Sequence, residues 1–227
     1  MKQMLGFNRY VQAVFVLVFV SLTGCVGAGG TTVALRTNEL APPKQPAQGR
    51  VLLLNQAGDQ YAGSPNVGKA VWTAFKAELG PISSDVPPRE KFVHLTKAAL
   101  EKAGYEVQVV TAKEAGAHLE PVLRVNIDQF AYEMWGYWYP YVPIEGRMSV
   151  VFALQSPDGR QLDGKVLTAE GKENCWFGWC AGALETAMAQ NLTKIMNQLI
   201  DWTSERSFRS SLIQASVHQE SSPSPSP

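Results

Sequence analysis

The second half of the chain is dominated by a pattern of alternating apolar and polar residues that permits little besides an antiparallel sheet. Residues 121–132 and 146–155 each place every second side chain on an apolar face, as strands with one buried face do. The turn signal Ser156-Pro157-Asp158-Gly159 follows, and residues 161–170 supply the return strand. The apolar parity shifts at Phe130 and Tyr132, which predicts a bulge or twist. We therefore expect a three-stranded meander.

The rest of the chain predicts helices to cover this sheet. Residues 51–54 form a short apolar run typical of a buried strand, and residues 105–110 predict another strand. A helix of about 14 residues is expected between Ser64-Pro65 and Gly80-Pro81, because apolar residues recur there every four positions. Further helices are predicted at 89–103 and 184–206. The predicted fold class is α+β: a mainly antiparallel meander sheet with helices packed on one face, in a single domain.

The N-terminus has the layout of a secretory signal peptide. Lys2 and Arg9 precede an apolar run of about a dozen residues, which is shorter than the roughly 20 that span a bilayer. The sequence Leu22-Thr23-Gly24-Cys25 resembles the bacterial lipobox, and this resemblance implies lipidation of Cys25 with acyl chains such as palmitate. Val26 follows, and by the enterobacterial sorting rule a residue other than Asp resembles an outer-membrane address facing the periplasm. The alternative is an ordinary signal peptide with a chance cysteine.

Composition divides the chain into four parts. Residues 1–24 are the signal peptide, 25–49 a lipidated cysteine and flexible tether, 50–208 the α+β domain, and 209–227 a disordered Ser/Pro tail. Removal of the signal peptide takes Lys2 and Arg9 with it and leaves 18 basic against 20 acidic side chains, a net charge of about −2. This balance does not favour a nucleic-acid partner.

Two aromatic segments are predicted to meet at one end of the meander. Residues 132–143, YEMWGYWYPYVP, hold six aromatic rings, and the sequence NCWFGWC follows Glu170. In a meander the first strand runs toward the same end as the third, so the two segments become neighbours. The candidate binding surface consists of Trp135, Tyr137, Trp138, Tyr139, Tyr141, Trp176, Phe177 and Trp179. Four roles stay open: a lid over the core, a docking surface for a partner protein, burial in a membrane interface, and a groove for sugar or lipid chains.

Cys175 and Cys180 are separated by four residues, and in an oxidising periplasm such a pair favours a disulfide. Free thiols and a metal site remain alternatives. A redox pair of the C-x-x-C type does not fit this spacing, and His94, His118 and His218 form no ligand spacing with the cysteines. The sequence thus predicts no metal site.

No catalytic or cofactor-binding motif is found in the sequence, and a non-enzymatic role without cofactor is expected. The rival hypothesis is a hydrolase of envelope polymers that uses Glu170 or Glu173 as acid or base beside the aromatic end.

The lipobox, the first apolar strand, the helix before GYEV, and LRVNIDQF followed by PDGRQL together resemble the YajG-type lipoproteins of Gram-negative envelopes. At the level of element order the chain is more weakly similar to auxiliary lipoproteins of lipid-transporting ABC systems. The resemblance implies a non-enzymatic accessory protein of the envelope, and an auxiliary subunit of a lipid-transport system is an alternative. We expect the lipid-anchored domain to bind or scaffold an envelope partner protein through the two aromatic segments.

Overall fold

The structure is a computed structural model that describes residues 30–55, 64–72, 77–115, 120–136, 141–176 and 180–220. Its centre is strand β6 (Val122–Gly136), which pairs along one edge with β7 (Tyr141–Gln155). Strand β7 in turn pairs with β8 (Gln161–Trp176). Both pairings are antiparallel, so the expected meander is confirmed, and its strands are longer than predicted. A register shift between Ile127 and Gln129 confirms the bulge that the shift in apolar parity indicated.

The complete sheet is mixed, which corrects the expectation of a mainly antiparallel meander. Strands β2 (Arg50–Asn55) and β3 (Asn66–Trp72) follow one another along the second edge of β6, and both are parallel to it. Beyond β2 lies β5 (Glu106–Thr111), and beyond β3 lie β4 (Ala77–Ser84) and β1 (Thr31–Val33). Eight strands therefore form one sheet among the residues that the structure describes.

The prediction of a helix between Ser64-Pro65 and Gly80-Pro81 is wrong, because β3 and β4 occupy this region as an antiparallel pair. Val67 and Val71 are β-branched and buried in this pair, where they pack better than in a helix. Gly68 lies so close to β6 that an added Cβ would be 2.0 Å from the carbonyl oxygen of Tyr132. Pairing with β6 thus overrides the four-residue recurrence of apolar side chains.

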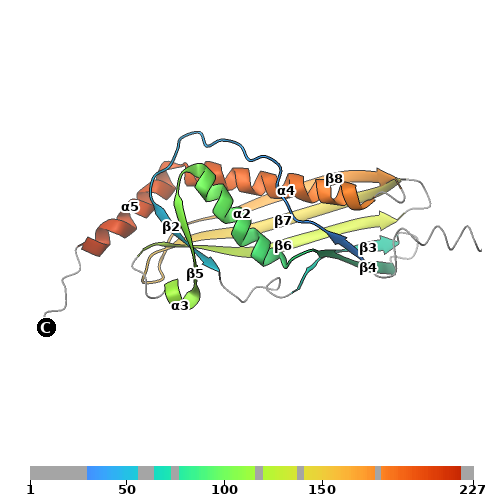
Figure 1. Ribbon diagram of the computed structural model, residues 1–227, viewed down its shortest axis with the longest axis horizontal. Helices are drawn as coiled ribbons and strands as arrows, with labels where there is room; N and C mark the ends of the chain where they lie inside the picture. The colour runs from blue at the N-terminus through green and yellow to red at the C-terminus, as the bar shows by residue number, and fades with distance from the viewer. Residues whose placement is uncertain are drawn as a thin grey trace, which may run out of the picture.

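Two long helices cover one face of the sheet (Figure 1). Helix α2 (Pro88–Ala103) agrees with the prediction and ends at Gly104, whose φ of 102° is the left-handed conformation that suits glycine. Helix α4 (Cys180–Thr203) packs on β8 and β7 of the sheet and against α2, and its buried stripe runs from Leu184 to Trp202. A short helix, α3 (Ala112–Ala115), packs with β2 and β5 instead. Ala115 of α3 joins a small apolar cluster of Leu52, Leu54, Val110 and Val122.

Both ends of the domain extend further than the sequence predicted. From Gly30 onward the expected tether is packed: Val33 and Leu35 are buried, and the backbone amides of Asn38 and Ala41 donate hydrogen bonds to side chains of α4. At the other end, helix α5 (Arg206–Glu220) occupies part of the segment expected to be disordered from residue 209. Phe208 anchors this helix, because its ring is fully buried and contacts Trp202 at a centroid distance of 4.8 Å.

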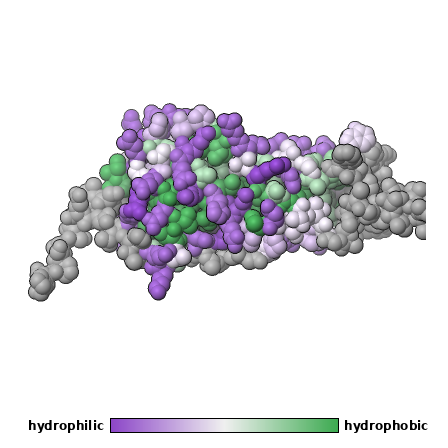
Figure 2. All heavy atoms as spheres, viewed as in Figure 1, coloured by the Kyte–Doolittle hydropathy of each residue, from purple (hydrophilic) through white to green (hydrophobic). Residues whose placement is uncertain are grey.

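The surface on the side shown in Figure 2 mixes hydrophilic and hydrophobic residues over its described part. Among the described residues, no helix is both long enough and apolar enough to cross a membrane.

Candidate interaction surface

The ends of β7 and β8 bring the two aromatic segments together. Tyr141, the first residue of β7, is the register partner of Trp176, the last residue of β8. Their ring centroids are 4.3 Å apart, and the two side chains are 50% and 56% exposed. The predicted convergence of the aromatic segments is confirmed for these two residues.

Strand alternation places the Tyr141–Trp176 pair on the face of the sheet away from α4. Their neighbours Val142 and Cys175 are buried on the opposite face, against the helical core. Trp135 of β6 alternates in the same way with buried Met134 and is partly exposed. We call Trp135, Tyr141 and Trp176 the aromatic end. The other predicted members of the binding surface, Tyr137, Trp138, Tyr139, Phe177 and Trp179, lie outside the described residues.

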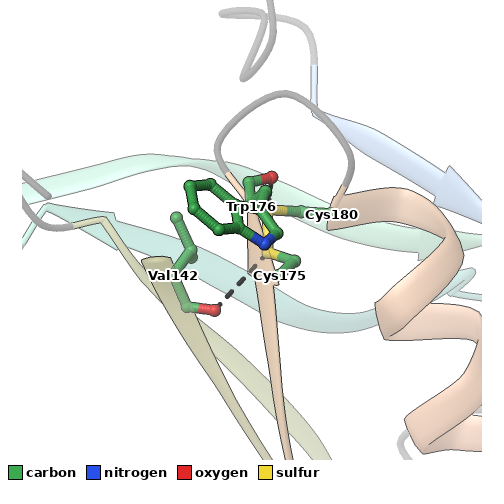
Figure 3. The surroundings of a disulfide bond; sticks show 4 residues. All are labelled: Val142, Cys175, Trp176 and Cys180. Atoms are coloured by element: carbon green, nitrogen blue, oxygen red, sulfur yellow. Dashed lines mark hydrogen bonds between the residues drawn. A yellow bond between two sulfur atoms is a disulfide. The ribbon is translucent and has the colours of Figure 1, made fainter. Parts of the chain in front are cut away.

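A disulfide ties the end of β8 to the start of α4. Cys175 and Cys180 are bridged with an S–S distance of 2.00 Å and a Cα–Cα distance of 5.0 Å, as the sequence predicted. The Sγ atom of Cys175 lies 3.4 Å from the carbonyl oxygen of Val142 (Figure 3). We interpret this as a packing contact, since a bridged sulfur carries no proton. The bridge holds the position of Trp176 relative to α4.

Behind the aromatic end, the same face of the sheet carries pairs of opposite charges. The Nζ atom of Lys172 on β8 lies 2.7 Å from Oε1 of Glu145 on β7. The Nε atom of Arg147 lies 3.5 Å from Oε1 of Glu170. The hydrogen bond from Lys172 lowers the pKa of Glu145 below its ordinary value. We call these two pairs the charge band. We did not predict the charge band from the sequence, although strand parity and the meander register place these side chains opposite one another.

A third charged group lies on β3 and β4. The Nζ atom of Lys69 lies 3.1 Å from Oε1 of Glu78 and 3.9 Å from Oε1 of Glu133 on β6. The hydrogen bond with Glu78 raises the pKa of Lys69. These three residues line a surface depression of about 690 Å³ whose other walls include Ser64, Asn66 and Gly80. The lining is mixed, because Val67, Phe130 and Tyr132 also contribute to it.

The two carboxylates considered for hydrolysis do not converge. Glu170 and Glu173 are three residues apart on one strand, so they point to opposite faces of the sheet. Glu170 pairs with Arg147, whereas Glu173 accepts a hydrogen bond of 3.2 Å from Gln190 of α4. The acid–base pair is therefore not assembled. Among the described residues, no group of three or more His, Cys, Asp or Glu side chains could hold a metal ion.

Comparison with solved structures places the fold in an α+β class that other bacterial proteins share. The chain is similar to a Xanthomonas campestris protein of family DUF330, with a TM-score of 0.54 and 14% identity over 85% of this chain and 100% of that one. At this identity the likeness establishes the fold alone.

Two lipoproteins with lower scores are also similar. A minor lipoprotein of Acinetobacter baumannii has a TM-score of 0.36 and 10% identity, over 72% of this chain and 95% of that one. A lipoprotein of Neisseria meningitidis has a TM-score of 0.29 and 15% identity, over 55% and 83%. These scores carry no conclusion. No family model and no curated protein matches the sequence, so the YajG-type resemblance stays a prediction.

Proposed function

We propose that this protein is a lipid-anchored accessory protein of a Gram-negative envelope, attached through Cys25 to the periplasmic face of the outer membrane. Its role is to bind or scaffold an envelope partner protein on the exposed face of the sheet. The observation that carries this proposal is the short distance in sequence between a lipobox and a folded domain. Cys25 precedes Gly30, the first described residue, by five positions.

The exposed face of the sheet supports a binding role. Exposed Tyr141 and Trp176 adjoin the charge band, and aromatic rings surrounded by polar groups are typical of interaction surfaces. The Glu170–Glu173 pair of the rival hydrolase hypothesis is divided between two faces.

The anchor is tested by labelling cells with radioactive palmitate and separating their membranes. We expect the wild-type chain to carry label and to fractionate with the outer membrane, and Cys25→Ser to lose both properties. Acylated, membrane-bound Cys25→Ser protein would contradict the proposal.

The binding role is tested by photo-crosslinking in intact cells, with a crosslinking residue at Arg147 or at Lys97. Arg147 lies in the charge band, whereas Lys97 lies on α2 on the other side of the sheet, and both side chains are solvent-accessible. We expect a discrete adduct with an envelope protein from position 147 and none from position 97. Equal adducts from both positions would exclude a specific docking face.

A further inference from the structure

The chain enters the domain from the aromatic end of the sheet. Strand β1 is parallel to β4, with Thr31 opposite Ile82. Strand β4 begins at Ala77, which pairs with Trp72, and Trp72 pairs with Gly136 at the end of β6. Strand β1 therefore begins on the side of the sheet where β6 and β8 end (Figure 1). This end carries Tyr141 and Trp176.

Chain length limits how far Cys25 lies from this end. Four residues lie between Cys25 and Gly30, and the five Cα–Cα steps that join them span at most about 18 Å when fully extended. A Cβ on Gly30 would be 2.7 Å from the carbonyl oxygen of Pro81, which places Gly30 beside Pro81 on β4. Pro81 lies four residues from Ala77, a distance of about 13 Å along a strand. The anchor can therefore reach the plane of the aromatic end.

The opposite end of the sheet is beyond the reach of the anchor. Strand β8 is 16 residues long, which corresponds to about 50 Å. A bilayer that holds Cys25 through acyl chains can therefore contact the aromatic end, whereas Cys25 itself cannot reach the Ser156–Gly159 turn.

The side chains at this end are those that suit a lipid–water interface. Tyrosine and tryptophan concentrate at the headgroup level of membranes, where one part of the ring is apolar and another forms hydrogen bonds. The first charge pair, Glu145–Lys172, lies four residues behind Trp176, or about 13 Å along the strand. Rings buried by about 5–10 Å, as interfacial elements are, leave this pair in water.

We propose that Tyr141 and Trp176 insert into the headgroup region of the same bilayer that holds the lipid on Cys25. The aromatic end of the sheet then contacts the membrane, and the opposite end points away from it. The proposal rests on the lipid anchor proposed above. The lipid and the rings act as two attachments to one surface. Because the lipid keeps the rings close to the bilayer, insertion of the rings is stable even though it would be weak on its own. The charge band then lies just above the headgroups, where a periplasmic partner reaches it.

The test separates insertion of the rings from lipidation in the cell. The sequence has three cysteines, and the Cys175–Cys180 disulfide leaves Cys25 as the free thiol. A purified chain of residues 25–227, which retains every described residue, is coupled through Cys25 to a maleimide lipid in phosphatidylcholine vesicles. Tryptophan emission is compared between vesicles with plain acyl chains and vesicles brominated at acyl carbons 6 and 7. The variants are Trp176→Phe, Tyr141→Ser and, as the control, Ile213→Ser.

We expect bromine to quench part of the wild-type emission, and Trp176→Phe to lose a measurable share of that quenching. Tyr141→Ser is expected to weaken the quenching by loosening the contact of Trp176 with the bilayer. Ile213 is 62% exposed and belongs to α5, a helix at the opposite end of the domain from the arrowheads of β6 and β8 (Figure 1), so its substitution leaves the quenching unchanged. Circular dichroism confirms that each variant is folded.

Equal quenching of wild type and Trp176→Phe would overturn the proposal, and so would unchanged accessibility of Trp176 to aqueous acrylamide after coupling. Either result would leave the aromatic end free for a protein partner. Quenching in vesicles combined with absent palmitate labelling in cells would refute the lipid anchor while supporting insertion of the rings.

Discussion

Asn191 of α4 donates a hydrogen bond of 2.8 Å from Nδ2 to the hydroxyl oxygen of Tyr132 on β6, and both side chains are buried. Strand β7 lies between β6 and β8, so the tyrosine side chain must cross β7 to reach the helix above β8. Gly146 of β7 and Gly171 of β8 make this possible, and they are register partners. A Cβ on Gly146 would be 2.1 Å from Tyr132 Cε1, and a Cβ on Gly171 would be 2.9 Å from Asn191 Oδ1.

The first prediction concerns this hydrogen bond. Tyr132→Phe removes the acceptor and leaves the buried amide of Asn191 unsatisfied, so we expect a loss of about 1–3 kcal/mol in the free energy of unfolding. Urea denaturation measures the loss. Tyr141→Phe is the matched control, because its ring is half-exposed and makes no such bond to the residues that the structure describes, so little change is expected. Equal losses in the two variants would show that the buried pair contributes nothing specific.

The second prediction concerns the space above β7. Gly146→Ala places a methyl group inside the ring of Tyr132, and we expect overpacking to cost about 1–3 kcal/mol. Gly182→Ala in α4 meets no atom within 4 Å and is expected to be neutral or stabilising by up to about 1 kcal/mol. Thermal unfolding of both variants gives the comparison, and a neutral Gly146→Ala would mean that Tyr132 has another favourable position.

The third prediction concerns the disulfide. Replacing both Cys175 and Cys180 by alanine should lower the free energy of unfolding by about 2 kcal/mol, because the short loop gains conformational freedom in the unfolded chain. Mass spectrometry of a non-reduced digest should show the two cysteines joined. Dithiothreitol should destabilise the wild type and leave the double variant unaffected. Alkylation of both thiols without reductant would contradict the bridge.

The fourth prediction concerns helix α5. Phe208→Ala empties a fully buried site between Trp202 and Tyr105, and we expect a cost of about 3–5 kcal/mol. Ile213→Ala on the exposed side of the same helix should change the stability by less than about 0.5 kcal/mol. Urea unfolding measures both changes. A small loss of stability in Phe208→Ala would indicate that α5 does not pack on the domain and that the segment is disordered, as the sequence predicted.

The fifth prediction is a loss of stability at alkaline pH. Burial raises the pKa of Tyr132, and the hydrogen bond from Asn191 opposes this only in part; burial also raises the pKa of Tyr105. In the unfolded chain both phenols ionise near pH 10, so the unfolded state loses protons first. The stability is therefore fully present below about pH 10 and falls as the pH rises further. The 295 nm absorbance should show these two residues ionising together with unfolding, and Tyr132→Phe should reduce the slope of stability against pH.

Local patterns in the sequence predicted those parts of the fold that depend on neighbouring residues. Alternation predicted β6, β7 and β8, the parity shift predicted the bulge after Ile127, and Gly104 marked the end of α2. The meeting of Tyr141 and Trp176 followed from the direction of these strands. These features need only the turn chemistry and periodicity of contiguous segments.

The parts that could not be predicted depend on distant partners. Residues 66–84 carry a helical recurrence, but Gly68 and Val71 pair with Tyr132 and Trp135, more than 60 positions away. The composition of residues 34–48 is typical of a flexible tether. The segment is nevertheless packed, because its backbone amides donate hydrogen bonds to side chains of α4, and composition does not reveal such partners. Helix α5 buries Phe208 and Leu212 in an otherwise polar segment, and two such residues give too weak a pattern to indicate a packed helix.

The arrangement of β2 and β3 along one edge of β6 has a consequence for the order of folding. Strands β6, β7 and β8 with α4 are contiguous between residues 122 and 203, and their contacts can form as that part of the chain emerges. Strands β2 and β3 precede β6 in the chain and can pair with it only once the chain has been made as far as residue 136. Local pairs such as β3 with β4 can form before this point, but the separate pairs join into one sheet only after β6 is in place, so closure of the sheet is a late step.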